Sequence, residues 1–328
     1  FDLGNVQYCV SWLKSLDDRL RRSFRCNRLV SEADLIFLPC SWGPYSEEYR
    51  PLLDELTRDA IVFGRDRNSV RFLNETLGAD RATLCPDLAI MCEPEDPALG
   101  RHLLGQLGLS VDQPILGVIP NCRCVEEGIT PLSDPAQYYR LLQRAVTWAK
   151  DNGYGIVGIS HMVGTDRDAK LLKDLAIPVV QSDKPGEVRS VIANLSAAVC
   201  SRYHSIVNCL VHGVPPISLG WHPKYSGIME LFGLLDFDHP LERDEGELVA
   251  RLDTMSATRD ELVQHLRMRV PEARSEIRSC MGSMSARIGG ASEVLQAPVV
   301  VDDRGIDTFL RHRSSRFQRL LRRVKRGA

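Results

Sequence analysis

The chain has 328 residues, 44% of them hydrophobic, so it can bury the cores of two ordinary domains, which excludes a disordered or fibrous protein. Its formal net charge of -2 gives no overall attraction to nucleic acid, so we expect no nucleic-acid partner, and any anion site must be local. The 10 scattered cysteines, with no long apolar span and no signal-peptide layout, favour buried free thiols in a cytoplasmic protein.

The first 97 residues alternate helical and strand patterns incompletely. The predicted elements are a helix at residues 6–22, a strand at 35–39, a helix from Glu47, a strand at 60–63 and a helix at 68–77. This pattern predicts an α/β domain at residues 1–97 that is shortened at its N-terminal end. The Pro- and acid-rich stretch at 86–97 is the expected linker.

Beyond the linker, short β-branched apolar runs alternate with helical patterns up to Phe232, which is typical of βαβ units and a parallel sheet. The strand candidates are residues 115–119, 155–160, 177–180, 197–200 and 216–219. A helical region follows at about residues 246–287, so we expect a second Rossmann-like domain with trailing helices at residues 98–290. The predicted fold class is therefore α/β, with two Rossmann-like domains facing each other across a cleft.

The remaining residues, 291–328, form a basic tail. From Arg311 onward there are eight Lys or Arg and no acid, with apolar residues at helical spacing. Such an amphipathic helix can make a peripheral contact with an anionic membrane surface. The alternative is a solvated helix packed on the protein, or a frayed terminus.

The strongest candidate site is the run from Ser201 to Ser205, which follows a buried strand and opens the next helix. Backbone N–H groups and the helix dipole favour an anion at this position. Arg202 can bind a carboxylate or phosphate with its planar fork, and His204 can exchange a proton near neutral pH. The residues alone indicate an anion site at a strand end.

Other polar residues also follow predicted strands, at the edge where ligands bind in open α/β sheets. Asn121, His161 and Lys224 do so in the second domain, and Arg65 does so in the first. For each of the first three, the alternative is a solvated loop residue; for Arg65, it is an ion pair with Asp66 or with a helix acid. We predict that Asn121, His161, Lys224 and Arg65 bind substrate.

Several familiar motifs are absent from the sequence. It contains no GxGxxG after a strand, no GxxxxGK[ST], no GxSxG elbow, no HExxH and no EF-hand loop. Readings as an NAD enzyme, a P-loop protein, a serine hydrolase or a zinc protease therefore lose their usual support, and we expect no cofactor and no metal site.

Three stretches resemble the polysaccharide pyruvyl transferase family. They are residues 38–44; residues 64–69 with Pro86-Asp87; and Ser201-Arg-Tyr-His-Ser205 with Gly213-Val-Pro215 and Lys224. The resemblance spans about residues 34–235. The front of the family's first domain, including its opening strand and glycine-rich turn, is absent or reduced here to Gly4-Asn5.

The resemblance implies a GT-B-like fold and an enzyme that moves a pyruvyl group from phosphoenolpyruvate to two hydroxyls of a sugar, forming a cyclic ketal. The acceptor would be a polysaccharide or its lipid-linked precursor. It also implies that Arg202 and His204 are the catalytic donor-site pair, with Tyr203 between them as a substrate-binding residue and Arg65 as a partner from the first domain. A scheme with His204 as general acid requires no metal and no cofactor.

Two other functions stay open at this point. A GT-B glycosyltransferase that uses a nucleotide sugar would employ the same arginines on a diphosphate. A non-catalytic relative that binds carbohydrate would keep the fold without turnover, and the shortened front of the first domain favours this reading.

Overall fold

The computed structural model describes residues 36–44, 47–58, 60–78, 80–126, 132–160 and 167–287. Backbone contacts divide the chain into two compact units, Phe1–Met281 and Gly282–Ala328, and only residues 282–287 of the second unit are described. The helix expected at residues 6–22, the segment Gly4-Asn5 and the basic tail lie outside the described residues. Among the described residues, no helix has the length and apolar character needed to cross a membrane.

The first sheet is small and parallel. Its strands β1 (Ile36–Cys40), β2 (Ile61–Gly64) and β3 (Thr83–Leu84) lie in the order β1-β2-β3. Helix α2 (Arg50–Thr57) follows the short turn η1 (Glu47–Tyr49), and α3 (Arg67–Leu77) follows β2. Asp66 caps α3 by accepting a hydrogen bond from the Ser69 N–H at 2.7 Å, as an N-cap acid does. Strands β1 and β2 are rich in Ile, Val and Phe and largely buried.

The second sheet has six parallel strands in the order β6-β5-β4-β7-β8-β9. These are β4 (Ile115–Ile119), β5 (Gly155–Ser160), β6 (Val179–Gln181), β7 (Ala197–Cys200), β8 (Pro216–Gly220) and β9 (Asp238–Pro240). The strand order reverses between β4 and β7. In open α/β sheets this reversal marks the edge where ligands bind, next to the carboxyl ends of the two strands.

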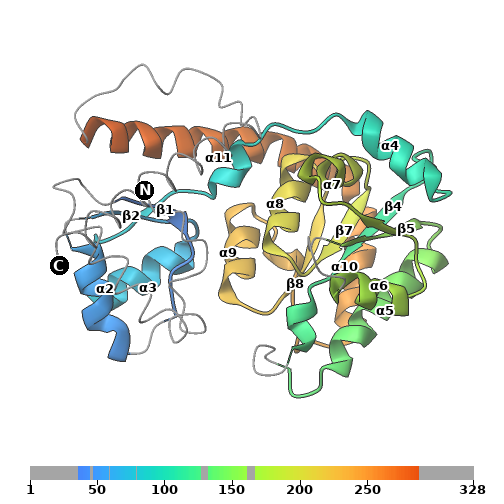
Figure 1. Ribbon diagram of the computed structural model, residues 1–328, viewed down its shortest axis with the longest axis horizontal. Helices are drawn as coiled ribbons and strands as arrows, with labels where there is room; N and C mark the ends of the chain where they lie inside the picture. Colours follow the sequence, from blue (N-terminus) through green and yellow to red (C-terminus); the bar gives the residue numbers. More distant parts are fainter. Residues whose placement is uncertain are drawn as a thin grey trace, which may run out of the picture. The chain divides into compact units, whose positions relative to one another are not determined.

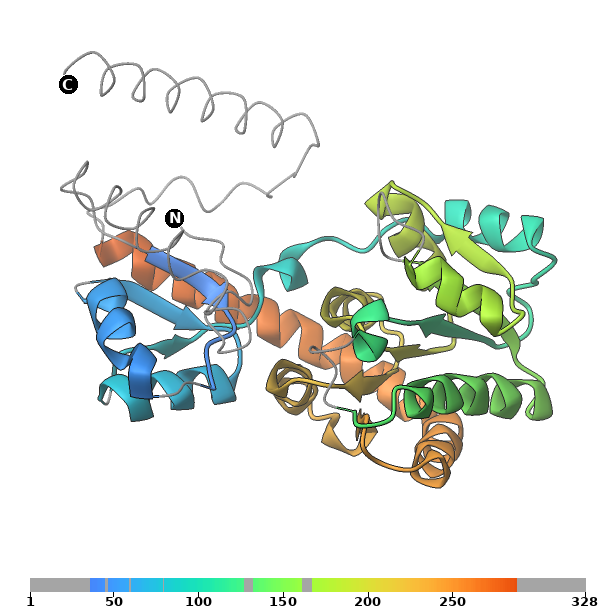
Figure 2. The ribbon, with the colours of Figure 1, turned by 60° about the horizontal axis from the view of Figure 1, so that its bottom comes forward.

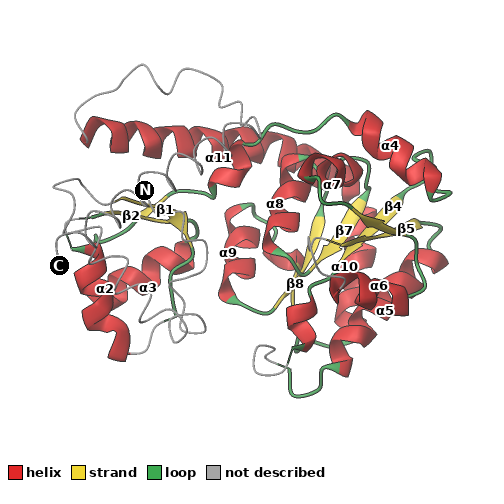
Figure 3. Cartoon of the chain, viewed as in Figure 1, coloured by secondary structure: helices red, strands yellow, loops and turns green. Residues whose placement is uncertain are grey.

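Helices cover both faces of this sheet (Figures 1 and 3). They are α5 (Ala136–Asp151), α6 (Arg167–Asp174), α7 (Pro185–Ile192), α8 (Tyr203–Val211) and α9 (Pro223–Leu231). In Figure 1, α5 and α6 lie below the strands and α7 lies above them, as right-handed crossovers require. The core is made of the strands themselves and the apolar stripes of these helices, for example Tyr138, Leu141 and Leu142 of α5, which are all fully buried.

Helix α10 (Glu245–Ala257) packs on α5, and Figure 2 shows the two side by side. Its N-cap is Asp244, which accepts the Glu247 N–H at 2.9 Å. Helix α11 (Arg259–Arg287) follows after one residue and carries Pro271 in its interior. Proline has no N–H, so one backbone hydrogen bond of the helix is missing there.

The predicted linker is structured rather than solvated. It contains the short turn η2 (Leu88–Met91), whose Ile90 is fully buried and which packs on α8. The Glu95 N–H donates to His212 Nε2 at 3.0 Å, and Arg274 of α11 donates to the carbonyls of Ile90 and Cys92 at 2.9 and 2.7 Å. Helix α4 (Pro97–Gln106) then packs on α7.

Four of the five strands predicted for the second domain are found within one residue of their predicted bounds, and the fifth, β6, is shifted by up to two. Two strands were not predicted, β3 and β9, because a two-residue strand and the sequence Asp-His-Pro carry no strand pattern. The predicted domain bounds, 1–97, 98–290 and 291–328, stay a proposal, which the two separate sheets support.

Candidate functional site

The carboxyl ends of the first sheet bring together three polar side chains. Arg65 follows β2; its Nε donates to Ser41 Oγ, just after β1, at 2.8 Å. A guanidinium N–H of Arg65 donates to Asp87 Oδ2, shortly after β3, also at 2.8 Å. The ion pair therefore runs to Asp87, and Asp66 instead caps α3. The Arg65 side chain is only 1% exposed, so its charge is held in place inside the protein.

Arg65 also contacts a helix that packs on the second sheet. Its guanidinium lies over the ring of Tyr203, the first residue of α8, with 3.7 Å to the ring centroid. A cation over an aromatic face is attracted by the ring's quadrupole, most strongly where water is excluded. Tyr203 is buried, so this contact fixes both side chains. Two of the predicted site residues, Arg65 and Tyr203, are thus in contact with each other.

The next residue, His204, is exposed to solvent. The protein around it still desolvates the imidazole and so lowers its pKa below the ordinary 6.5; Asp87 opposes this shift, whereas Arg65 and Lys224 add to it. The neutral imidazole is therefore favoured near pH 7. An accessible, neutral imidazole in the field of these cations can accept a proton, and a bound anion favours the protonated form, which can then donate that proton.

Lys224 lies in the first turn of α9, which follows β8. Its ammonium lies 5.2 Å from the Trp221 ring centroid and 5.1 Å from that of Tyr225. Its charge lowers the pKa of His204 and of His222. Lys224 therefore belongs to the same positively charged surroundings as Arg65 and His204.

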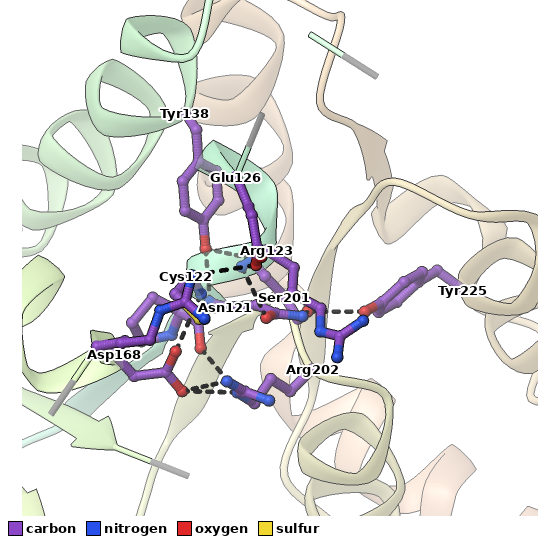
Figure 4. A network of polar contacts seen from close by, with 11 residues as sticks. Asn121, Cys122, Arg123, Glu126, Tyr138, Asp168, Ser201, Arg202 and Tyr225 are labelled. Atoms are coloured by element: carbon purple, nitrogen blue, oxygen red, sulfur yellow. Dashed lines mark hydrogen bonds and ion pairs between the residues drawn. The ribbon is translucent and has the colours of Figure 1, made fainter. Parts of the chain in front are cut away.

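Arg202 has a different environment, shown in Figure 4. It is the N-cap residue of α8, and its guanidinium pairs with Asp168 of α6 through Nε at 2.7 Å and a terminal nitrogen at 2.5 Å. Asp168 is fully buried and also accepts the Cys122 N–H at 2.9 Å. The Arg202 side chain remains 20% exposed. The pair thus links the ends of β4 and β7 to α6. The strand order of the sheet reverses between these two strands.

Asn121 is part of the same network. Its amide donates to the Ser201 carbonyl at 3.1 Å, and its side-chain oxygen accepts the Arg123 N–H at 3.1 Å. The Tyr225 hydroxyl donates to the same Ser201 carbonyl at 2.8 Å, and Figure 4 shows these side chains converging on Ser201. Asn121 is 5% exposed and its polar groups are used within the protein. Its binding of substrate stays a prediction, beside this structural role.

His161, the remaining predicted site residue, lies outside the described residues. Three residues of the site were not predicted: Asp87, Asp168 and His222. Asp87 could have been found, because Pro86-Asp87 belongs to one of the stretches that carry the family resemblance. Asp168 gives no signal in the sequence, since an acid in the first turn of a helix is common.

His204, Arg65 and Lys224 share one positively charged environment, which would favour a bound anion. The accessible His204 lies in the field of Arg65 and Lys224, and Arg202 is held at the point of strand-order reversal. Such an arrangement can bind a carboxylate or phosphate and move a proton to or from the bound molecule.

The sequence matches the model of the polysaccharide pyruvyl transferase family over residues 9–223. No curated protein matches the chain. One similar solved structure is an α,α-trehalose-phosphate synthase (UDP-forming) from Burkholderia vietnamiensis, with 10% identity, a TM-score of 0.52, and coverage of 80% of this chain and 71% of that one. Another is OtsA in its apo form, with 9% identity, a TM-score of 0.55, and coverage of 81% and 69%.

A UDP-GlcNAc 2-epimerase from Methanocaldococcus jannaschii is also similar, with 12% identity and a TM-score of 0.42 over 60% of this chain. The chain spans about half of that protein's length, 54%. At these identities the likeness to solved structures concerns the fold alone. The predicted GT-B-like class, α/β with two Rossmann-like domains and parallel sheets, is confirmed.

Proposed function

This chain belongs to the polysaccharide pyruvyl transferase family, and we propose that it moves a pyruvyl group from phosphoenolpyruvate to two hydroxyls of a sugar, forming a cyclic ketal. The acceptor is a polysaccharide or its lipid-linked precursor. The observation that supports this most is the accessible His204, whose imidazole lies in the field of two cations, Arg65 and Lys224. Phosphoenolpyruvate carries both a carboxylate and a phosphate, which such a site attracts.

In the proposed mechanism His204 is the general acid. Binding of the multiply negative donor raises the pKa of His204, because an anion nearby favours the imidazolium. The imidazolium protonates the methylene carbon, which becomes a methyl group, and positive charge develops on the neighbouring carbon. A sugar hydroxyl attacks that carbon and returns its proton to His204.

The second half of the reaction expels phosphate. The C–O bond to phosphate breaks as His204 donates its proton to the departing group. The second sugar hydroxyl then attacks the same carbon, closes the ketal and returns its proton to the neutral His204. The products are the pyruvate ketal and inorganic phosphate, with atoms and charge in balance. The fixed charges of Lys224 and Arg65 stabilise the departing phosphate.

The roles of the two arginines differ in this proposal. Arg65 acts through its charge, since its side chain is 1% exposed and held by Asp87 and Tyr203. Arg202 offers the exposed part of a guanidinium whose orientation is fixed by Asp168. We retain Arg202 as the second residue of the catalytic pair, and Tyr203, Asn121 and His161 as substrate-binding residues.

A phosphate-release assay tests the proposal. Wild-type protein, phosphoenolpyruvate and a panel of glycans should release phosphate, and His204→Ala should reduce the rate at least a hundredfold, the lower range for loss of a general acid. His102→Ala is the matched control, because His102 is an exposed helix residue of α4 whose ring contacts only Gln106 among the described residues. If His204→Ala keeps the wild-type rate, His204 is not the general acid.

A nucleotide-sugar glycosyltransferase is the second candidate function. It is favoured by the similarity in fold to a UDP-forming synthase. Thermal shift separates the two, because only a ligand of the folded protein raises the melting temperature. Stabilisation by phosphoenolpyruvate and not by UDP-sugars supports the pyruvyl transferase. The reverse result supports the glycosyltransferase, and glycan binding without turnover supports a non-catalytic relative.

We also propose a cytoplasmic location, with peripheral membrane contact through the basic tail. The support is the sequence of residues 311–328 alone, which carries eight Lys or Arg and no acid. Deletion of these residues should weaken sedimentation with vesicles that contain phosphatidylserine, whereas unchanged binding removes the idea.

A further inference from the structure

A second histidine lies next to the proposed donor site. His222 follows β8 and is the N-cap residue of α9, where its Nδ1 accepts the Lys224 N–H at 3.2 Å. In a neutral imidazole one nitrogen accepts and the other carries the proton. Because Nδ1 is the acceptor, the proton of His222 is on Nε2.

The surroundings of His222 keep it neutral. Burial lowers its pKa to about 3, and the charges of Lys224 and Arg65 contribute to the shift. The ring lies edge-on to Trp221, with 6.0 Å between centroids. The described part of the chain gives Nε2 no hydrogen-bond partner, so within it this nitrogen is a donor with its position set by the cap and its proton unused.

The same two cations act on both histidines of the site. Arg65 and Lys224 lower the pKa of His204 and of His222. The two imidazoles therefore share one positively charged environment, but they differ in their anchoring. His222 is anchored through the cap of α9, whereas His204 is exposed and its ring lies edge-on to that of Tyr203.

We propose that His222 binds the donor, by giving a hydrogen bond from Nε2 to a carboxylate or phosphate oxygen of the molecule that His204 protonates. The inference rests on the proposed function and adds a residue to its site. The two rings then have different roles: His222 binds the anion through its Nε2–H, and His204 transfers a proton. Because the His222 imidazole stays neutral, its Nε2–H keeps its hydrogen bond to the substrate while His204 gives up its proton.

Two substitutions separate the two nitrogens of His222. In His222→Asn the side-chain oxygen replaces Nδ1 as the cap of α9, since Asn is a favoured N-cap, but the group at Nε2 is lost. In His222→Gln the amide N–H reaches the place of Nε2, but the cap is lost. Binding of phosphoenolpyruvate by isothermal titration calorimetry, melting temperature and steady-state kinetics are measured for both variants and for wild type.

We expect His222→Asn to keep the wild-type melting temperature and to bind phosphoenolpyruvate at least tenfold more weakly, the loss expected for one hydrogen bond to a charged group. Its KM for phosphoenolpyruvate should rise by the same factor while kcat stays within about twofold, as for loss of uniform binding. His222→Gln should bind within about threefold of wild type and melt at a lower temperature, because it loses the cap.

The outcomes distinguish this inference from the function on which it rests. Wild-type affinity in a folded His222→Asn variant overturns the role of His222 and leaves the proposed function standing. A drop in kcat with unchanged KM likewise overturns it, since His222 would then act on the chemical step. Failure of the wild-type protein itself to bind phosphoenolpyruvate overturns the proposed function, and the inference with it.

Discussion

The guanidinium of Arg65, at the end of β2, lies 3.7 Å from the ring centroid of Tyr203, the first residue of α8. This contact joins the edge of the small first sheet to the helix that carries His204. It places the Arg65–Asp87 ion pair beside the proposed donor site, and Asp87 and Arg65 both act on the pKa of His204. The electrostatics of the site therefore depend on residues from both sheets.

The stacking contact predicts unequal effects of two substitutions at Tyr203. Tyr203→Phe keeps the ring under Arg65 and should lower the free energy of unfolding by no more than about 1 kcal/mol. Tyr203→Leu removes the ring from a buried cation and should lower it by about 2 to 4 kcal/mol. Urea unfolding measures both, and equal losses in the two variants would show that the cation–π contact contributes little.

Removal of the Asp87 carboxylate should lower the pKa of His204 further. Asp87 raises that pKa against the effects of burial, Arg65 and Lys224, so Asp87→Asn leaves only the lowering contributions. An NMR titration of the His204 ring measures the shift. Glu93→Gln is the control, since Glu93 has an 82% exposed side chain and does not contribute to the His204 shift. A higher pKa in Asp87→Asn contradicts the prediction.

Arg202 and Asp168 should be strongly coupled. Asp168 is fully buried, so Arg202→Met leaves a carboxylate without its charge partner and should destabilise the protein by about 3 to 5 kcal/mol. The double variant Arg202→Met, Asp168→Asn should recover part of that loss. A double-mutant cycle in urea measures the coupling, and simple addition of the two single effects would mean that the pair does not act as a unit.

Gly227 of α9 should not tolerate a side chain. A Cβ at this position would lie 2.7 Å from the Asp66 Cβ, so helix α9 or the N-cap of α3 would have to move. Gly227→Ala should destabilise the protein by about 1 to 3 kcal/mol, although alanine favours a helix. The matched control is Gly105→Ala in α4, where a Cβ meets nothing within 4 Å and stability should rise by about 0.5 to 1 kcal/mol. Equal effects at both positions would contradict the close approach.

Stability should fall as the pH drops below 6.5, partly through His239. This residue of β9 is fully buried, and burial, followed by the charge of Arg251, lowers its pKa to about 4. Between pH 6.5 and 4 this histidine binds a proton in the unfolded chain but not in the folded chain. Each pH unit in this range therefore lowers the free energy of unfolding by up to about 1.4 kcal/mol.

The substitution His239→Leu tests this sign. Between pH 7 and pH 5 the free energy of unfolding should fall less steeply in the variant than in wild type. The difference in slope should be at most about that caused by one bound proton. Urea unfolding at several pH values gives both slopes. A variant with the wild-type slope would assign the acid sensitivity to other groups.

The sequence predicted the second sheet well because its strands are self-contained apolar runs. Residues 115–119, 155–160 and 197–200 are the observed bounds of β4, β5 and β7. The edge strand β9 could not be predicted, because Asp-His-Pro becomes a strand only by pairing with β8. Here the tertiary partner, and not the local pattern, decides the conformation.

The sequence named candidate site residues but not the partners that those residues have in the folded chain. Arg65, Arg202, His204 and Lys224 were predicted because they follow strands. In the structure, His204, Arg65 and Lys224 share one electrostatic environment. That Arg202 pairs with Asp168, 34 positions away, depends on how α6 packs, which no local signal reports. The protonation of His222 likewise depends on a cap contact that only the folded chain makes.

Helix α11 has a consequence for the order in which the chain can fold. The carbonyl of Ile90 receives its hydrogen bond from Arg274, which is 184 positions later in the sequence. At a synthesis rate of about 5 to 20 residues per second, this partner leaves the ribosome roughly 10 to 40 seconds after Ile90 does. During that interval the linker carbonyls that α11 later binds depend on water, and the packing of η2 is completed only after α11 has been synthesised.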